Sequence, residues 1–275
     1  VADASAPLCL WPGVRTWASD EHVQNPDVLL EQLDRFEPPG TPTNNLGRTG
    51  GPVWLHVALQ VDADSDGQWL LALHHAPLDD ARVYVYEDGR RIAQHSLGSF
   101  QAFADRPLPT RTHAAPLQLR AGTRVDLLLR VSARSTAIVP LTLEKPATLL
   151  RAESRAQLLH GLELGMLLAL LVYGLAQAGS LRDHAAWASA ALVAGSVGVV
   201  LFDSGLGQQY VWERQADEHV AKLGSVFLLL MAAGSAWFVR HVVATRKTLP
   251  IVDGMLRALA IVAFAGAAAI WLLRE

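Results

Sequence analysis

Segment 103–113 gathers the side chains of this sequence that are best suited to binding a ligand. Its proline-rich run includes an aromatic ring, two guanidinium groups and an imidazole, from Phe103, Arg106, Arg111 and His113. A guanidinium group binds a carboxylate through two parallel hydrogen bonds, and an aromatic ring offers a flat surface for stacking. We therefore predict contact with a polar ligand such as a sugar or a carboxylate. In the structural alternative, both arginines pair with surface acids, or Arg106 caps carbonyl groups of the loop.

Two other polar stretches resemble metal sites only in part. Residues 62–67, Asp-Ala-Asp-Ser-Asp-Gly, match the opening of a calcium-binding loop, but its twelfth position, where a bidentate glutamate is needed, is Leu73. We predict a solvated hairpin turn there. His74 and His75 would point to opposite faces of a strand and so would not share one ion. Because no catalytic motif occurs either, the sequence predicts no metal, no cofactor and no enzyme activity for this chain.

The first half of the chain shows the alternation that is typical of strands. In residues 53–61, the side chains of Trp54, His56, Ala58 and Gln60 oppose a row of valines and leucines, which predicts one wet and one buried face. Similar runs occupy 68–75, 81–87, 112–119, 124–132 and 136–143. Turn residues separate these runs, and a short helix is expected over 27–35. Short strands at this spacing predict an all-β jelly roll or sandwich over residues 1–144.

The second half of the chain has the composition of a membrane domain. Charged residues make up 18% of the whole chain, against roughly 25% in a typical soluble domain, and they become rare after Leu164. Apolar segments lie near 162–178, 185–202, 220–239 and 255–273. Each approaches the ~20 residues that a helix needs to cross about 30 Å of hydrocarbon. We therefore predict an α-helical transmembrane bundle over residues 161–275.

Loop charges predict the orientation of these helices. The connection 240–257 has four basic residues and one acidic residue, whereas 203–219 has four acidic residues and one basic residue. Because positive loops stay in the cytoplasm, connection 240–257 is expected inside and connection 203–219 outside. The β domain, which precedes the first helix, is then outside the cytoplasm. Tyr210 and Trp212 suit the outer interface of the membrane.

Two features bear on how the halves are joined and packed. Residues 145–160 are predicted to form a linker helix, which is either a stiff lever into the membrane or a passive spacer. Gly161 and Gly165 on the first predicted span would allow close contact with another helix. Gly195 and Gly198 give the second span a small-residue surface, which predicts tight packing inside the bundle.

The chain contains a series of different short motifs in a specific order and spacing. They are Trp54-Leu55, Leu78-Asp79, Val83-Tyr84, Phe103, Arg106-Pro107, Arg111, Leu117, Gly122, Leu129-Arg130-Val131 and Pro140-Leu141, then Gly161, Gly165, Tyr173, Leu181-Arg182-Asp183, Gly205 and Gln209-Tyr210-Val211-Trp212. In this order they resemble the seven-transmembrane receptors with diverse intracellular signalling modules. The β half is similar to the second type of extracellular domain in that family. The likeness extends from about residue 15 to residue 275.

This resemblance implies a jelly-roll sensor, similar to carbohydrate-binding modules, joined to a seven-helix bundle. Family members commonly continue into a cytoplasmic diguanylate cyclase or histidine kinase. The sequence is expected to stop within the bundle, after about four helices of seven, and it contains no motif of either output module. Trp54 and Tyr84, two aromatic residues among those that bear the resemblance, join the candidate ligand-binding residues.

The leading hypothesis is a receptor of the bacterial inner membrane, with its N-terminal domain in the periplasm. A small molecule or glycan would bias two arrangements of the helices by its differential affinity for them. A rival hypothesis is a membrane-anchored module that docks a periplasmic protein; a transporter fragment fits less well, because the spans lack buried charges and breaks. Membrane lipid and a second copy of the chain are further expected partners. A net charge of −3 without a basic face argues against nucleic acid.

Overall fold

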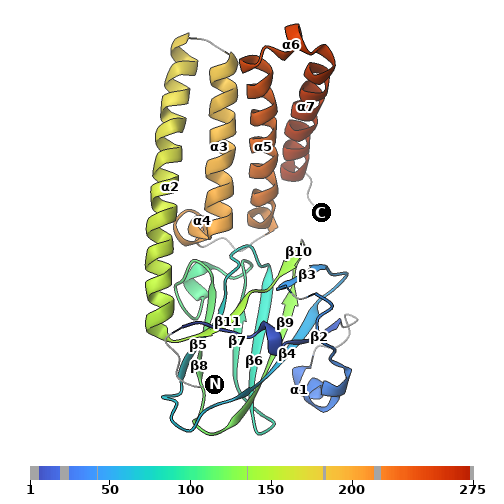
Figure 1. Ribbon diagram of the computed structural model, residues 1–275, viewed down its shortest axis with the longest axis vertical. Helices are drawn as coiled ribbons and strands as arrows, with labels where there is room; N and C mark the ends of the chain where they lie inside the picture. The colour runs from blue at the N-terminus through green and yellow to red at the C-terminus, as the bar shows by residue number, and fades with distance from the viewer. Residues whose placement is uncertain are drawn as a thin grey trace. The chain divides into compact units, whose positions relative to one another are not determined.

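Figure 1 shows the computed structural model of the chain, which describes residues 6–18, 25–41, 43–134, 136–181, 184–213 and 218–272. The chain divides into two compact units. One comprises Val1–Arg155 together with Gln208–Ala216, and the other comprises Ala156–Gly207 together with Asp217–Glu275. The first unit therefore includes a short segment from the second half of the sequence.

The first unit is built from antiparallel strands. Their bounds are β1 (Leu8–Cys9), β2 (Arg15–Ala18), β3 (Asn45–Arg48), β4 (Val53–Gln60), β5 (Gln68–Leu73), β6 (Asp80–Glu87), β7 (Arg90–Leu97), β8 (His113–Gln118), β9 (Arg124–Ser132), β10 (Thr136–Ile138) and β11 (Leu141–Glu144). They form a five-stranded sheet in the order β2-β4-β9-β6-β7, a four-stranded sheet in the order β1-β11-β5-β8, and the pair β10-β3. The predicted β-sandwich is confirmed.

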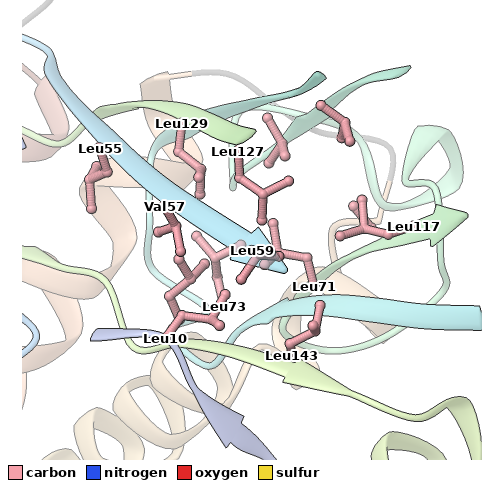
Figure 2. Packing of buried hydrophobic residues seen from close by; sticks show 14 of the residues in the cluster. Leu10, Leu55, Val57, Leu59, Leu71, Leu73, Leu117, Leu127, Leu129 and Leu143 are labelled. Carbon is pink, nitrogen blue, oxygen red and sulfur yellow. The ribbon is translucent and has the colours of Figure 1, made fainter. Parts of the chain in front are cut away.

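One apolar core fills the space between the two larger sheets (Figure 2). From the five-stranded sheet, β4 contributes Leu55, Val57 and Leu59, every second residue of the strand. Leu71 and Leu73 of β5 reach the same core from the four-stranded sheet. These five side chains are exposed by 5% or less. Full burial of one such side chain stabilises the fold by about 1.5–3 kcal/mol, so this core holds the two sheets together.

The outer face of the five-stranded sheet is also covered, so the prediction of a wet face is wrong for His56, which is 7% exposed, and for Trp54. Its side chain is fully buried and packs with Tyr84 beneath residues 26–36. This covering segment consists of α1 (Pro26–Leu29) and the 3₁₀ helix η2 (Leu30–Arg35), where a single helix was expected over 27–35. Leu29 and Phe36 insert into the cluster. A period of two identifies which face a residue occupies, but not whether another segment covers that face.

The outer face of the four-stranded sheet is covered by the start of helix α2 (Pro146–Leu181). Leu149 is fully buried against Leu70, Ala72 and Ala114 of the sheet. The first turns of α2 therefore belong to the β unit, which extends to Arg155. The helix continues without a break through the predicted linker into the apolar span.

Several local details differ from the sequence analysis. Residues 62–67 do not form a hairpin turn, because β4 and β5 lie in different sheets and the segment crosses between them. Asp66 of this crossover contacts the ammonium group of Lys145. Strands β1, β2, β3 and β7 were not predicted. Strand β7 is an edge strand in which half of the side chains are exposed, so it shows no clear apolar alternation.

The second unit consists of helices that follow one another along the chain. After α2 come α3 (His184–Ser204), α4 (Leu206–Tyr210), whose residues from Gln208 onward belong to the first unit, α5 (Glu218–Val242), α6 (Thr245–Thr248) and α7 (Pro250–Leu272). Among the described residues, four helices, α2, α3, α5 and α7, are long and apolar enough to cross a membrane. They match the four predicted spans, and Figure 1 shows them side by side in chain order.

Helices α3 and α5 pack with unusually close backbones. A Cβ atom added at Gly195 of α3 would lie 2.4 Å from the backbone nitrogen of Met231. On α5, a Cβ atom at Gly234 would lie 2.4 Å from the backbone nitrogen of Leu192. The predicted tight packing of the second span is therefore confirmed, and these positions require glycine. A Cβ atom at Gly161 of α2 would meet no described atom within 4 Å.

These contacts predict opposite effects for two matched substitutions. Gly195→Ala should destabilise the helical unit by about 1–3 kcal/mol, because the new methyl group overlaps the α5 backbone. Gly161→Ala should be neutral or stabilising by up to about 1 kcal/mol, because alanine favours a helix and has open space there. Thermal unfolding of the helices, followed by far-UV circular dichroism in detergent micelles, measures both. Equal stability of the two variants would contradict the packing.

Candidate ligand-binding site

The segment that was predicted to bind a ligand joins the two large sheets, because β7 precedes it and β8 follows it. It leaves β7 at Gly98, where φ is 120° and an added Cβ atom would lie 2.4 Å from the carbonyl oxygen of Asp79. The next backbone amide, that of Ser99, donates to the carbonyl of Leu78 at 2.7 Å. The 3₁₀ helix η3 (Phe103–Asp105) then turns the chain toward Arg106. The loop is thus held at its start by close backbone contact.

Arg106 is the buried centre of this loop, with only 8% of its surface exposed. Its Nη1 donates to the carbonyl oxygen of Thr110 at 3.1 Å and, at 3.5 Å, to that of Arg111. Its Nη2 donates to Oε1 of Gln208. The guanidinium carbon lies 5.2 Å from the centre of the Phe103 ring. Burial lowers the pKa of Arg106 to about 10, so the side chain still carries its charge at neutral pH.

Gln208 belongs to α4 and is a residue that the sequence analysis missed. It is 5% exposed, and its Nε2 donates to the carbonyls of Ser99 at 2.8 Å and Gln101 at 3.1 Å. Nearby, the amide of Phe103 donates to the carbonyl of Glu213 at 2.8 Å. Residues 208–213, which connect α3 to α5, are therefore part of the β unit.

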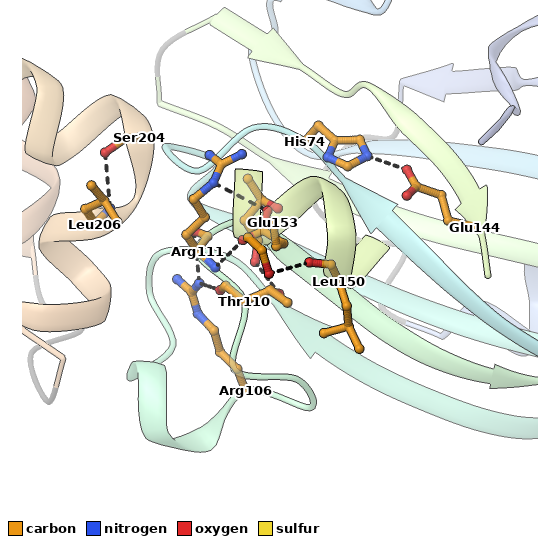
Figure 3. A network of polar contacts seen from close by, with 11 residues as sticks. His74, Arg106, Thr110, Arg111, Glu144, Leu150, Glu153, Ser204 and Leu206 are labelled. Atoms are coloured by element: carbon orange, nitrogen blue, oxygen red, sulfur yellow. Dashed lines mark hydrogen bonds and ion pairs between the residues drawn. The ribbon is translucent and has the colours of Figure 1, made fainter. Parts of the chain in front are cut away.

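Arg111 attaches the other end of the loop to α2 (Figure 3). Its Nε lies 3.4 Å from Oε1 of Glu153, and its backbone amide donates to Oε2 of the same carboxylate at 3.3 Å. Glu153 is 5% exposed and stands one turn after the buried Leu149. This second residue was also missed, because nothing in the local pattern of α2 distinguishes it from other polar residues of the helix.

Both structural roles considered for the arginines are therefore present. Arg106 caps carbonyl groups of its own loop, and Arg111 pairs with an acid. Of the donors that these contacts leave over, Nε of Arg106 is buried and has no hydrogen-bond partner among the described residues. Phe103, Arg106 and Arg111 form one cluster, which we name the arginine loop cluster.

His113 lies beside this cluster but is fully buried. Its Nδ1 accepts a hydrogen bond from the amide of Gly98 at 3.3 Å, and its Nε2 lies 3.0 Å from the carbonyl oxygen of Ala76. The carbonyl can only accept, so Nε2 has the proton and the ring is neutral. Burial, with a contribution from the charge of Arg106, lowers the pKa of His113 to about 3. Both ring nitrogens are engaged by the backbone.

Trp54 and Tyr84 lie in a different place from the arginine loop cluster. Their ring centres are 5.9 Å apart in the cluster on the outer face of the five-stranded sheet, beneath residues 26–36. Tyr84 is 4% exposed and Trp54 is fully buried. A ligand would reach these two rings only after displacement of the covering segment.

His74 and Asp79 contact different partners in the structure. Nε2 of His74 lies 2.6 Å from Oε1 of Glu144, a buried carboxylate that also accepts from Thr142 at 2.7 Å. Burial alone would raise the pKa of Glu144, but these hydrogen bonds outweigh it and lower that pKa. Asp79 instead accepts from the backbone amide of Arg134 at 2.6 Å. Within the described residues, no group of three or more metal-ligating side chains occurs.

The fold and the site define a class of protein: a β-sandwich domain that precedes apolar helices, with a polar loop attached to the chain segments that enter those helices. Comparison with protein families agrees with this class. The family model described as 7TMR-DISM extracellular 2 matches residues 19–145, and that described as 7TM diverse intracellular signalling matches residues 156–274. No match to a curated protein is found.

Together these two matches cover both units of the fold. The chain belongs to the family of seven-transmembrane receptors with diverse intracellular signalling modules. It is a receptor-like membrane protein in which an extracellular sensor domain precedes the membrane helices. Neither of the two matched domains is catalytic.

The buried neutral ring of His113 predicts a loss of stability in mild acid. Its pKa falls from 6.5 to about 3 on folding, so its contribution is complete above pH 6.5 and is lost as the pH falls toward 3. The expected slope is about 1.4 kcal/mol per pH unit, because the unfolded chain binds the proton first. His113→Gln should flatten the decline between pH 6.5 and 5, where most carboxylates stay ionised.

Thermal unfolding of the β unit in the micelle-bound chain, followed by circular dichroism, measures this decline. His160→Gln provides the control, since His160 lies on the surface of α2, at 34% side-chain exposure. An unchanged slope in His113→Gln would show that the imidazole is not the group that titrates.

Proposed function

We propose that this protein is a signalling receptor of the bacterial inner membrane whose extracellular domain lies in the periplasm and senses a small polar ligand. The arginine loop cluster is the proposed ligand contact. The signal passes through the helices to a cytoplasmic output module, for which a diguanylate cyclase and a histidine kinase are the candidates. Carbohydrate-like molecules and organic acids are the ligand classes that suit guanidinium and aromatic groups.

One observation supports this proposal above the others: the loop of the arginine cluster contacts both chain segments that lead into the helices. Arg111 pairs with Glu153 on α2, and Arg106 binds Gln208 on the connection between α3 and α5. These partners are 42 and 102 residues away in the sequence. A ligand that rearranges the loop would therefore act on three membrane helices through two buried polar contacts.

The continuous α2 gives one of these contacts a mechanical route. Leu149 and Glu153 are four residues apart and so face the β domain from one side of the helix. Because no break separates them from the apolar span, a tilt of the sheet would move the span with it. The ligand would need only a differential affinity for two such arrangements to shift their populations.

The alternative function is a docking module for a periplasmic protein. Large apolar side chains exposed on the β unit, such as Leu8, Val28 and Ile92, come from different elements of the chain. Scattered single apolar residues are ordinary on soluble surfaces and do not indicate a protein interface. We therefore favour a small ligand, and leave the docking function as an outcome of the test.

Ligand binding can be measured as a thermal shift of the whole chain in lipid nanodiscs. A panel of neutral sugars, uronic acids and dicarboxylates should contain compounds that stabilise the β unit by about 2.7 kcal/mol at a hundred times their dissociation constant. The double variant Arg106→Ala, Arg111→Ala should lose this stabilisation. Arg120→Ala should keep it, because that side chain is 77% exposed on the same unit.

Two results would contradict the proposal. Stabilisation that persists in the double arginine variant would place the ligand elsewhere on the domain. If no compound of the panel acts while one purified periplasmic protein binds the chain, the docking function replaces ligand sensing.

A further inference from the structure

We propose that Arg106 forms a carboxylate-binding site whose present acceptor is the side-chain amide of Gln208, so that an acidic ligand displaces Gln208 and releases residues 208–213 from the β unit. This inference rests on the proposed sensing function and deepens it, because it names the ligand class and the contact that the ligand breaks.

The first support is the absence of a countercharge. Among the described residues, Arg106 contacts only neutral acceptors: the carbonyls of Thr110 and Arg111 and the amide oxygen of Gln208. Glu153, which contacts the same loop, is paired with Arg111. A buried cation without an anion is costly, since water is removed and no opposite charge replaces it. A negatively charged ligand would restore that balance.

The second support is the geometry of the guanidinium group. Its Nε and Nη2 atoms lie on one edge, and together they match the two oxygens of a carboxylate. In the structure, Gln208 Oε1 accepts from Nη2, while the buried Nε has no hydrogen-bond partner among the described residues. An amide offers one acceptor oxygen, whereas a carboxylate offers two. The amide thus engages Nη2 alone, whereas a carboxylate can accept from Nη2 and Nε together.

The third support is what Gln208 holds in place. Through its Nε2 it binds the carbonyls of Ser99 and Gln101, so one side chain makes three of the contacts between its segment and the loop. A carboxylate that takes both Nε and Nη2 removes the acceptor role of Gln208. The chain on either side of this segment is α3 and α5, so the release changes the constraint on two membrane helices.

Chemical rescue of a truncated side chain tests the site without knowledge of the natural ligand. Gln208→Ala, prepared as the full chain in nanodiscs, removes the amide and opens the Arg106 edge. Acetate and acetamide are the probes, because they have the same shape and differ in charge. At constant ionic strength, acetate should raise the unfolding temperature of this variant and bind about tenfold more tightly than acetamide. The double variant Arg106→Gln, Gln208→Ala should not respond to either probe.

Three outcomes overturn the inference: acetamide binds as tightly as acetate, the double variant responds equally, or Gln209→Ala, the neighbouring control, gains the same response. Hydrogen exchange of the unsubstituted chain tests the release itself. Galacturonate should increase the exchange of amides 208–213, whereas galactose, which lacks the carboxylate, should not. Unchanged exchange with bound galacturonate overturns the displacement.

The sensing function can fail separately from this inference. Should galactose stabilise the unsubstituted chain while acetate leaves Gln208→Ala unchanged, the receptor senses a neutral ligand and only the carboxylate site is wrong. Should no member of the ligand panel bind while acetate still rescues Gln208→Ala through Arg106, the anion site stands and the proposed ligand classes fail.

Discussion

The apolar outer face of the four-stranded sheet is the constraint on which the joining of the two halves depends. Ala72 and Ala114 leave a shallow surface there, and Leu149 fills it completely. Without a covering element this surface would be exposed to water, so the sheet needs the start of α2 as much as α2 needs an anchor. A membrane helix and a β-sandwich thereby share one hydrophobic cluster, and the domain boundary falls inside a helix at Arg155.

Polar contacts then determine the orientation of α2 on the sheet. The Arg111–Glu153 pair is mostly buried and lies one helical turn beyond Leu149, which fixes how the helix is rotated on the sheet as well as where it sits. Removal of one partner from a buried pair is more damaging than the pair is stabilising, because it leaves a charge without compensation. Such contacts stabilise one arrangement of the helix on the sheet and destabilise similar arrangements in which a charge is left unpaired. A receptor needs that property if its arrangements are to differ sharply.

Much of the fold could be predicted because it follows from local patterns. The strand β4 alternates along its length, and each membrane span contains a long, mostly apolar run, since most side chains of a helix in lipid face hydrocarbon. The edge strand β7 escaped prediction because half of its side chains are exposed and no apolar alternation marks it. Trp54 was assigned to the correct face, but the cover provided by residues 26–36 depends on a tertiary contact that no periodicity records.

The candidate site could also be predicted only in part. Arg106 and Arg111 could be selected from residue type and the proline-rich context, and the structure does bring them together with Phe103. Their partners could not be predicted, because Glu153 and Gln208 come from distant parts of the chain and belong to no motif for such a contact. Residue chemistry therefore indicates which side chains can bind, whereas the fold decides which of them meet.

The unbroken course of α2 has a consequence for the kind of motion that it can transmit. Leu149 and Gly174 belong to one helix, and their separation corresponds to about seven turns, so they project from nearly the same side of its axis. Gly174 is the position where α2 approaches Ala190 of α3, at 3.8 Å from an added Cβ atom. Any rotation of the helix about its axis at Leu149 is therefore also a rotation at Gly174. Rotation of α2 by a fraction of a turn would bring a bulkier neighbour of Gly174 toward Ala190. A rotation of α2 would therefore also change its distance from α3.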